Sequence, residues 1–317
     1  MTATFALYIN VPPEQPELLA AGVAHYLEQI GSARLASIYF KNPTPRVVDQ
    51  TIAQIQPVWT LDAQTEITAE ITAEITAKIF RSDIPALKTA GVNRLSLGDG
   101  SGALVMAATT HIPNINVDVV YTAADRASEK GASRLEKVLE TLCRAPITHV
   151  SLYEDDFIAE PDIYEAARDI ILAHGLSPYD IYHFCKPGFE SVHQLWYLAY
   201  RPYIGLGPDA HGRLMIDGAL CATETYDDTG WAKAVHTSGH GLRLCVPLTD
   251  MEQTQEALLQ GLSGVKGVDM KELAAPLAGE KLDFLKQQGL IITEGDLLKA
   301  TAEGAFKINA IVKALVD

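Results

Sequence analysis

The chain has 317 residues, of which 48% are hydrophobic and 21% are charged, and its formal net charge is −15. This length allows one large α/β domain with a small appendage. The absence of an apolar run of about 18 residues excludes a transmembrane helix, and the acidic balance disfavours nonspecific binding to nucleic acid or to anionic membranes.

The N-terminus and the cysteines indicate a cytoplasmic protein. The first residues, MTATFALYINVPP, lack the basic start and the A-x-A-like end of a signal peptide, so we expect none. None of the cysteines stands in a C-x-x-C pair, and their wide spacing is typical of ordinary reduced thiols. It predicts neither a zinc site nor an iron–sulfur cradle. They are Cys143, Cys185, Cys221 and Cys245.

From residue 5 to about 185, short β-like runs alternate with amphipathic helical runs. Strands are expected at 6–11, 36–40, 94–98, 115–121, 148–153 and 179–184. Helices are expected between them, with apolar stripes at helical spacing. These stripes are Val23, Leu27 and Ile30; Leu135, Val138, Leu139 and Leu142; and Ile163, Ala166, Ala167, Ile170 and Ile171, before a stop at Gly175.

This alternation predicts parallel strands covered by helices, and function in such folds gathers at the carboxyl ends of the strands. The residues expected at those ends are Asn10, Lys41, Asp99, Thr122, Glu154, Asp155 and His183.

The segment EITAEITAEITAKI (66–79) repeats with period four, which on a helix would stack Glu66, Glu70 and Glu74 on one face. Its dense β-branching favours a strand at its start. We interpret it as a tandem duplication that lengthens a strand-to-helix connection rather than as a functional acidic ladder.

Three domains are expected: 1–215, a partial barrel closed by the turn GLGPDAHG (205–212); 216–248, a hairpin and connecting helix; and 249–317, a helical, winged-helix-like lobe with a hairpin at 289–301. The lobe holds seven lysines, no arginine and eleven acidic residues. A DNA-reading wing needs basic charge, so a lid or a dimerisation lobe is the better interpretation.

Several stretches, in chain order, carry a family resemblance. They are LYINVP (7–12), AGVNRLSLG (90–98), NINVDVVY (114–121), HVSLYE (149–154), YDIYHFCKPG (179–188), HQLWY (193–197) and GLGPDAHGRL (205–214). Together they resemble the oxygen-independent coproporphyrinogen III oxidase family, specifically its HemW-type heme-chaperone branch. The resemblance spans nearly the whole chain and implies a three-quarter parallel βα barrel, similar to a TIM barrel, with a helical C-terminal lobe.

Active members of that family bind an iron–sulfur cluster through C-x-x-x-C-x-x-C after the first strand, and S-adenosylmethionine binds its open iron. Here an ungapped alignment places Glu14, Leu18 and Ala21 at those positions. Leucine and alanine have no lone pair to offer iron, so we expect no cluster and a pseudoenzyme of this radical S-adenosylmethionine family.

Binding of S-adenosylmethionine itself is doubtful, because two loops that approach it in the family have changed. The glycine-rich turn after the second strand is KNPTP (41–45), and the loop after the fifth strand is TAADRA (122–127). Tyr8 and Asp118 match family positions around this cofactor and are the residues implied to hold it.

In HemW-type proteins a His-Asn-x-x-Tyr-Trp motif is associated with heme binding. Residues 193–198 read His-Gln-Leu-Trp-Tyr-Leu, so the resemblance implies that His193 and Tyr197 bind heme. Imidazole and tyrosinate are both axial ligands of heme iron, and a helix would place the pair on one face. A packed His193 is the alternative, and His183, Cys185 and His211 are alternative ligands.

The expected function is a cytoplasmic, cluster-free heme chaperone or sensor whose ligand is heme or a porphyrin, with a heme-receiving protein as a further partner. Two alternatives stay open: an enzyme that uses S-adenosylmethionine without radical chemistry, and a non-catalytic partner of a cluster-bearing paralogue. Binding to nucleic acid and stable membrane insertion are not expected.

Overall fold

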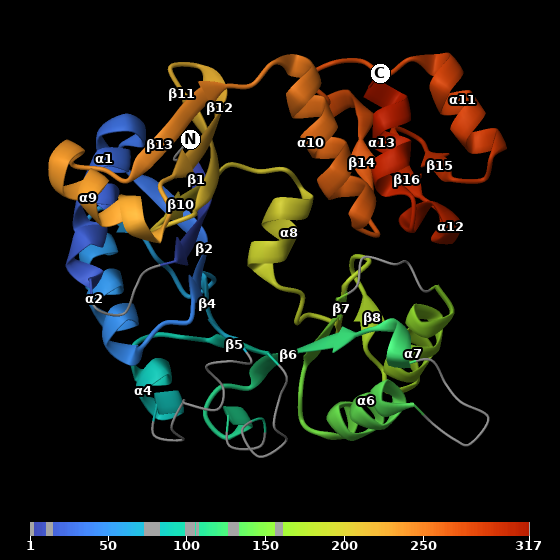
Figure 1. Ribbon diagram of the computed structural model, residues 1–317, viewed down its shortest axis with the longest axis horizontal. Helices are drawn as coiled ribbons and strands as arrows, with labels where there is room; N and C mark the ends of the chain where they lie inside the picture. Colours follow the sequence, from blue (N-terminus) through green and yellow to red (C-terminus); the bar gives the residue numbers. More distant parts are fainter. Residues whose placement is uncertain are drawn as a thin grey trace. The chain divides into compact units, whose positions relative to one another are not determined.

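A computed structural model describes residues 3–10, 15–72, 83–98, 105, 108–125, 133–155 and 161–316 (Figure 1). Its contacts divide the chain into two compact units. The first unit comprises Met1–Val117, Ser191–His193 and Arg201–Leu248; the second comprises Asp118–Glu190, Gln194–Tyr200 and Thr249–Asp317. No helix in the described part of the chain is long and apolar enough to cross a membrane.

The first unit is built on a sheet with the strand order β13-β12-β11-β10-β1-β2-β4-β5. Its β10, β1, β2, β4 and β5 run parallel, while β10 to β13 form antiparallel pairs. The strands are β1 (Ala3–Asn10), β2 (Ala33–Lys41), β4 (Glu66–Ile71), β5 (Arg94–Gly98), β10 (Tyr203–Leu206), β11 (His211–Ile216), β12 (Ala219–Thr225) and β13 (Leu242–Pro247), with the short β3 (Trp59–Thr60) beside β2.

The parallel strands of this sheet alternate between apolar and polar side chains, and helices cover the apolar side. Ile52 of α2 and Ile67 of β4 both lie next to Gly91, which shows α2 packed against that side. The covering helices are α1 (Leu19–Ile30), α2 (Pro45–Ile55) and α4 (Asp83–Thr89) (Figure 1). Because successive side chains of a strand point to opposite faces, the polar residues share the other face.

The chain passes into the second unit within β6 (Asn114–Tyr121). There β7 (His149–Glu154) pairs antiparallel with β9 (His183–Cys185), which pairs with β8 (Ser177–Pro178). Two amphipathic helices, α6 (Arg134–Arg144) and α7 (Pro161–Ala173), belong to this unit, and α6 begins with a capping box formed by Ser133 and Glu136. The helix α8 (Val192–Leu198) is divided between the units, with its residues up to His193 in the first and those from Gln194 in the second.

The C-terminal part of the second unit has its own apolar core, to which Leu258, Leu298 and Ile311 contribute. Its elements are α10 (Asp250–Ser263), β14 (Val268–Asp269), α11 (Gly279–Gln287), β15 (Ile291–Glu294), β16 (Leu297–Ala300), α12 (Ala302–Ala305) and α13 (Ile308–Val316). The hairpin predicted at 289–301 is confirmed as β15 and β16. The hairpin predicted from residue 216 begins earlier, at His211, and is followed by α9 (Asp228–Ser238).

One predicted strand is wrong. Residues 179–184 do not form a single strand, because the Asp180 carboxylate accepts hydrogen bonds from the backbone N–H groups of Tyr182 and His183 (2.8 and 2.7 Å). A short acidic side chain that bonds the backbone two residues ahead makes a turn. The chain therefore turns at Asp180 and only then enters β9, which is antiparallel to β7.

All three predicted apolar stripes are partly wrong, and in α6 Val138 is only half-buried. Leu27 is only half-buried in α1, whose buried stripe contains Val23 and Tyr26 instead. In α7, Ala166 is exposed. Helical spacing predicts the period of a buried stripe. Which residues lie at the middle of the stripe depends on the strands against which the helix packs.

The close approach of Gly207, which follows β10, to Asn10 at the end of β1 can be tested by substitution. Its φ is +97°, and a Cβ there would lie 1.6 Å from the Asn10 carbonyl oxygen. We expect Gly207→Ala to lower the free energy of unfolding by about 3 kcal/mol, from backbone strain and collision together. Gly218→Ala is the control, because its φ is +83° but no atom lies within 4 Å of the added Cβ. It should cost about 1 kcal/mol. Equal losses in urea unfolding of the two variants would contradict this.

Candidate functional site

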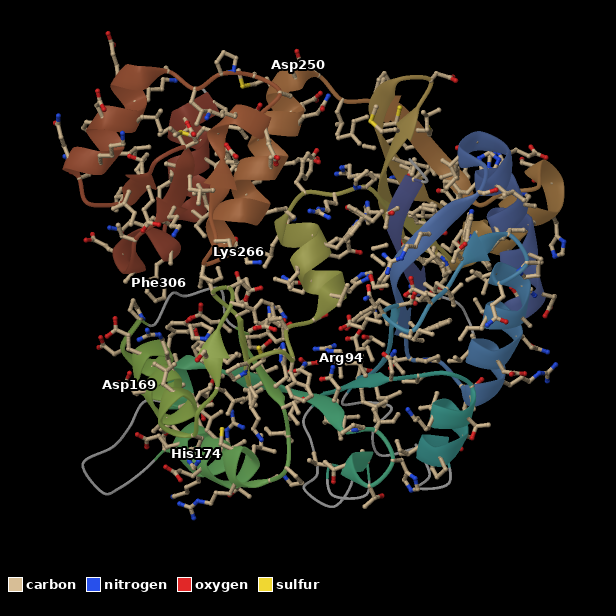
Figure 2. All side chains as sticks on the ribbon, turned by 180° about the vertical axis from the view of Figure 1, so that it is seen from behind. Arg94, Asp169, His174, Asp250, Lys266 and Phe306 are labelled. Carbon is tan, nitrogen blue, oxygen red and sulfur yellow. The ribbon has the colours of Figure 1, made fainter. Side chains whose placement is uncertain are left out.

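Polar side chains line one face of the first unit's sheet, here called the polar face. Register pairs Tyr8 with Tyr39, and Ser37 with Glu66, so these residues point to the same side of neighbouring strands. Figure 2 labels Arg94, which belongs to this face. The face comprises Tyr8, Ser37, Tyr39, Glu66, Thr68, Glu70, Arg94 and Ser96.

Glu66 binds the start of α8 to the polar face. Its carboxylate is 6% exposed and accepts hydrogen bonds from the Ser191 hydroxyl (2.9 Å), the Val192 N–H (2.9 Å) and the His193 N–H (3.1 Å). The first N–H groups of a helix lack partners within the helix and carry partial positive charge, so a carboxylate is a favourable acceptor there. Glu66 is thus a helix anchor, a role that the acidic repeat did not predict.

His193 is only 4% exposed, and two residues of β2 fix its ring. Its Nδ1 lies 2.8 Å from the Ser37 hydroxyl oxygen, and its ring stacks on Tyr39 with centroids 5.0 Å apart. Tyr39 in turn stacks on Tyr8. Burial, helped by the positive charge of Arg94, lowers the pKa of His193 to about 3. The imidazole is therefore neutral near pH 7, the form in which it ligates metals.

The other residues predicted to bind a ligand occupy different places. Tyr197 is half-buried on α8. Tyr8 lies on the polar face, where burial and the nearby Glu70 raise its pKa to about 12, whereas Asp118 falls in the second unit. His211 is largely exposed on β11, and Cys185 is buried on β9.

The described cluster-ligand positions are apolar and packed. Leu18 is 9% exposed and forms a small core cluster with Trp231 and Val235 of α9, against which Ala21 packs. Glu14, the third position, lies outside the described residues. Hydrocarbon side chains cannot hold iron, so the described positions do not fit an iron–sulfur cluster.

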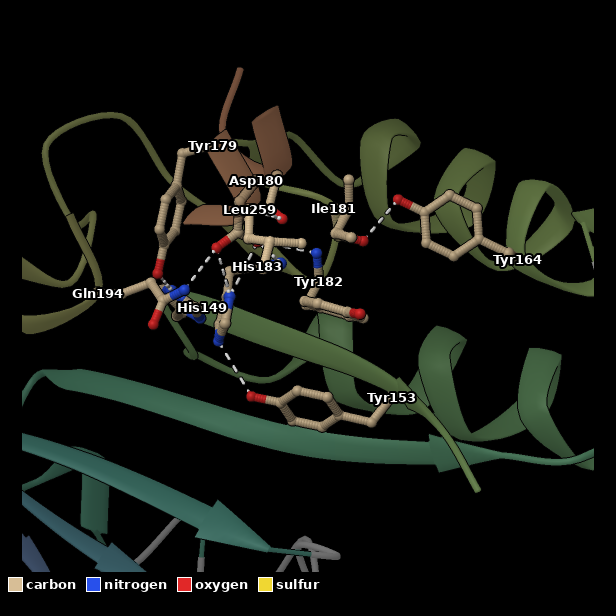
Figure 3. Close-up of polar contacts among 11 residues, drawn as sticks. His149, Tyr153, Tyr164, Tyr179, Asp180, Ile181, Tyr182, His183, Gln194 and Leu259 are labelled. Carbon is tan, nitrogen blue, oxygen red and sulfur yellow. Dashed lines mark hydrogen bonds and ion pairs between the residues drawn. The ribbon is translucent and has the colours of Figure 1, made fainter. Parts of the chain in front are cut away.

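The second unit contains a chain of three hydrogen-bonded side chains, here called the relay (Figure 3). The Asp180 carboxylate lies 2.8 Å from His183 Nδ1, and His183 Nε2 lies 3.0 Å from the Tyr153 hydroxyl. The side chain of Asp180 is 1% exposed and that of His183 is 12% exposed. Gln194 of α8 donates a further hydrogen bond to the Asp180 carboxylate (2.9 Å).

The contacts of Asp180 favour one arrangement of protons in the relay. Its carboxylate also accepts two backbone N–H bonds, so it is an acceptor for the Nδ1–H of His183. In the tautomer with its proton on Nδ1, Nε2 of His183 accepts a hydrogen bond from the Tyr153 hydroxyl. A phenol with this arrangement can pass its proton to the imidazole, which the buried carboxylate stabilises as a cation.

Tyr153 also lines a cleft of about 970 Å³ that lies entirely within the second unit. Side chains from α7, β7, α10 and the α12–α13 segment form its walls, and Asp180 and Tyr182 contribute to it. Three of its apolar side chains are unusually exposed: Tyr182 (43%), Val265 (52%) and Phe306 (40%), the last labelled in Figure 2.

Sequence reasoning identified His183 as a strand-end residue but missed its two relay partners. Tyr153 stands 30 residues away, and the antiparallel pairing of β7 with β9 brings the two together. The signal that could have identified Asp180 is its place as an acidic turn residue three positions before a histidine. Among the residues that the structure describes, no group of three or more His, Cys, Asp or Glu side chains is arranged to hold a metal ion.

Comparison of the sequence with those of known proteins finds several relatives. Radical S-adenosyl methionine domain-containing protein 1 of Bos taurus, named as mitochondrial, is 26% identical over 346 residues, covering 90% of this chain and 77% of the relative. The heme chaperone HemW of Lactococcus lactis is 26% identical over 341 residues, covering 90% and 86%. HemW of Bacillus subtilis is 25% identical over 279 residues, covering 73% and 71%. No model of a known protein family matches the chain.

Among solved structures, the coproporphyrinogen III oxidase HemN of Escherichia coli, described as a radical SAM enzyme, has a TM-score of 0.72. It is 16% identical and the match covers 99% of this chain and 90% of that one. This likeness shows the fold, so the predicted α/β architecture with a mostly parallel sheet and covering helices is confirmed. The resemblance stated from the sequence is confirmed by the HemW relatives.

The buried His193 makes stability depend on pH. The pKa of His193 is about 3 in the folded protein, against about 6.5 in an unfolded chain, so acid favours the unfolded state. The stabilisation is complete above pH 6.5 and is lost as the pH falls towards 3. Between pH 7 and pH 5 we expect the free energy of unfolding of the native protein to drop about 2 kcal/mol more than that of His193→Asn. Urea unfolding of both proteins at the two pH values measures this, and parallel losses would show that His193 is protonated when folded.

Proposed function

We propose that this chain, a homologue of the HemW heme chaperones, binds heme or a related porphyrin and does so without an iron–sulfur cluster. It is then a pseudoenzyme with respect to radical chemistry, and it carries or senses its porphyrin ligand. A heme-receiving protein or a cluster-bearing paralogue is the partner that this role requires.

The proposal that the chain has no iron–sulfur cluster is supported chiefly by the packing of Leu18 and Ala21. Both positions contribute to the apolar cluster with Trp231 and Val235, so they are structural here. Replacing them by cysteine would supply thiolates only by opening that cluster. Porphyrin binding is supported by the HemW relatives and by an imidazole kept neutral at His193.

A second candidate function is binding of S-adenosylmethionine for non-radical chemistry, and the residue that favours it is Tyr8. Its ring stacks with Tyr39 at 6.0 Å on the polar face, and such a surface suits a flat purine. However, Asn42, which stands where the family has a glycine-rich turn, has a φ of +49°, and its side-chain oxygen accepts a hydrogen bond from the Thr72 N–H. The turn therefore carries a side chain where the family has bare backbone, which weakens the case for S-adenosylmethionine. Isothermal calorimetry with S-adenosylmethionine decides between the two.

The cellular compartment of the protein, expected to be the cytoplasm, remains a prediction. The four cysteines, all within the described ranges, form no disulfide, which agrees with a reducing environment such as the cytoplasm. Mammalian relatives are named as mitochondrial, so that location is the alternative.

Anaerobic reconstitution with iron and sulfide should give no stable cluster, because the donor set after β1 lacks thiolates. Iron analysis and the visible absorbance of the desalted protein measure this. About four irons per chain, with the broad absorbance of an iron–sulfur cluster, would refute the cluster-free proposal.

Hemin titration tests porphyrin binding and the residues implied by the resemblance. If His193 supplies an axial ligand, iron must bind at Nε2, since Ser37 contacts Nδ1. His193→Ala should then shift the Soret band and lower affinity at least tenfold, about 1.4 kcal/mol. Tyr197→Phe keeps the ring and should change the spectrum less. An unchanged spectrum and affinity in His193→Ala would place the ligand elsewhere, and thermal melts check that both variants fold.

A further inference from the structure

The cleft of the second unit has the chemistry of a ligand site. Large exposed apolar side chains are costly in water, yet Tyr182, Val265 and Phe306 gather in this one hollow. Ligand sites are typically concave, mostly apolar and provided with a few placed polar groups. The cleft has the volume for a ligand of several fused or linked rings, at about 970 Å³.

Aromatic side chains form part of its walls. Tyr153 and Tyr182 lie with ring centroids 5.8 Å apart, and Tyr164 meets Phe306 edge to face at 5.4 Å. Aromatic rings of this kind bind a flat aromatic molecule through stacking and edge contacts. Tyr164 is held in place because its hydroxyl donates to the Ile181 carbonyl oxygen (2.9 Å).

Charged groups of both signs line the cleft. Arg168 from α7 and Lys307 from the segment between α12 and α13 contribute positive charge, and Glu154, Glu165 and Asp180 contribute negative charge. Among the described residues, Arg168 has a long contact with Asp169 (4.0 Å), whereas Lys307 pairs with Glu303 (2.7 Å). Charge alone therefore does not select the ligand, although Arg168 is placed to pair with a carboxylate on the ligand's edge.

The relay supplies the selective element. A tyrosine whose hydroxyl donates to a carboxylate-backed imidazole is poised to become a phenolate when a Lewis acid approaches its oxygen. Ferric iron in a porphyrin is such an acid, and phenolate is one of its protein ligands. A flat aromatic molecule with a Lewis-acidic centre is a metalloporphyrin.

We propose that this cleft is a second porphyrin site, separate from His193, in which the Tyr153 oxygen is the axial ligand of ferric heme. The proposal rests on the proposed function and adds to it a place and a ligand atom. On binding, the phenol O–H bond breaks and its proton moves to His183 Nε2. The phenolate lone pair forms the bond to iron, and the water or hydroxide that hemin carried leaves. Iron stays ferric, and Asp180 balances the new imidazolium charge.

Two probes separate iron ligation from general stacking: hemin and metal-free protoporphyrin IX. Tyr153→Phe keeps the ring but removes the ligand oxygen. It should abolish the phenolate-to-iron charge-transfer band and lower the affinity of this site for hemin about tenfold or more, while metal-free protoporphyrin binds as before. His183→Asn keeps a donor for Asp180 but removes the proton acceptor, so it should weaken the same band.

Tyr182→Phe is the matched control, because Tyr182 lines the same cleft and lies outside the relay. It should leave the band intact. Near-ultraviolet circular dichroism confirms folding of each variant.

The outcomes distinguish the two proposals. If hemin gives only an imidazole-type spectrum that Tyr153→Phe leaves unchanged, the cleft proposal is wrong and porphyrin binding stands. Loss of the phenolate band in Tyr182→Phe instead of Tyr153→Phe also overturns it, because the relay would then be irrelevant to ligation. Absence of any hemin complex in the native protein overturns the proposed function itself.

Discussion

The bond between the Glu66 carboxylate and the start of α8 is the constraint on which the first unit's polar face depends. Three donors from Ser191 to His193 converge on one buried carboxylate, and charge-assisted bonds of this kind are each worth about 1.5–3 kcal/mol. Since the helix start is fixed to β4, the side chain of His193 can only point towards Ser37 and Tyr39. An isolated helix of seven residues would not form, so this anchor also explains why α8 exists.

The two histidines that the sequence offered as heme ligands are in opposite situations. His193 is enclosed, neutral and stacked, and a ligand reaches it only if α8 or its neighbours move. His183 is partly exposed, but both of its ring nitrogens are engaged, one with Asp180 and one with Tyr153. Neither nitrogen of His183 faces a ligand directly, so we expect it to act as a proton acceptor for Tyr153. His193, in contrast, is considered as a direct ligand of a metal.

Most of the strands and helices could be predicted from periodicity, because apolar and polar residues alternate in β5, β6 is rich in β-branched residues, and α6 carries clear capping residues. The error at 179–184 had a local physical cause, the Asp180 side chain, which competes with the ladder for backbone N–H groups. The sites were harder, because they depend on pairing between distant segments. Glu66 lies 125 residues from Ser191, and no local pattern indicates that they meet. The family motif drew attention to His193, but it carries no information on burial or on the Tyr153 hydroxyl.

The parallel pairing of β1 with β10 has a consequence for biosynthesis. Ala6 pairs with Tyr203, so β1 waits for a neighbour that is made roughly 200 residues later. At ribosomal speeds this interval is about 10–40 s, during which one edge of β1, including the buried Leu7 and Ile9, has no strand beside it. Non-local pairing of this kind slows folding and leaves a β edge open to other chains. The edge of β1 at residues 3–10 is therefore the part of the nascent chain most open to pairing with a strand of another molecule until β10 has been made.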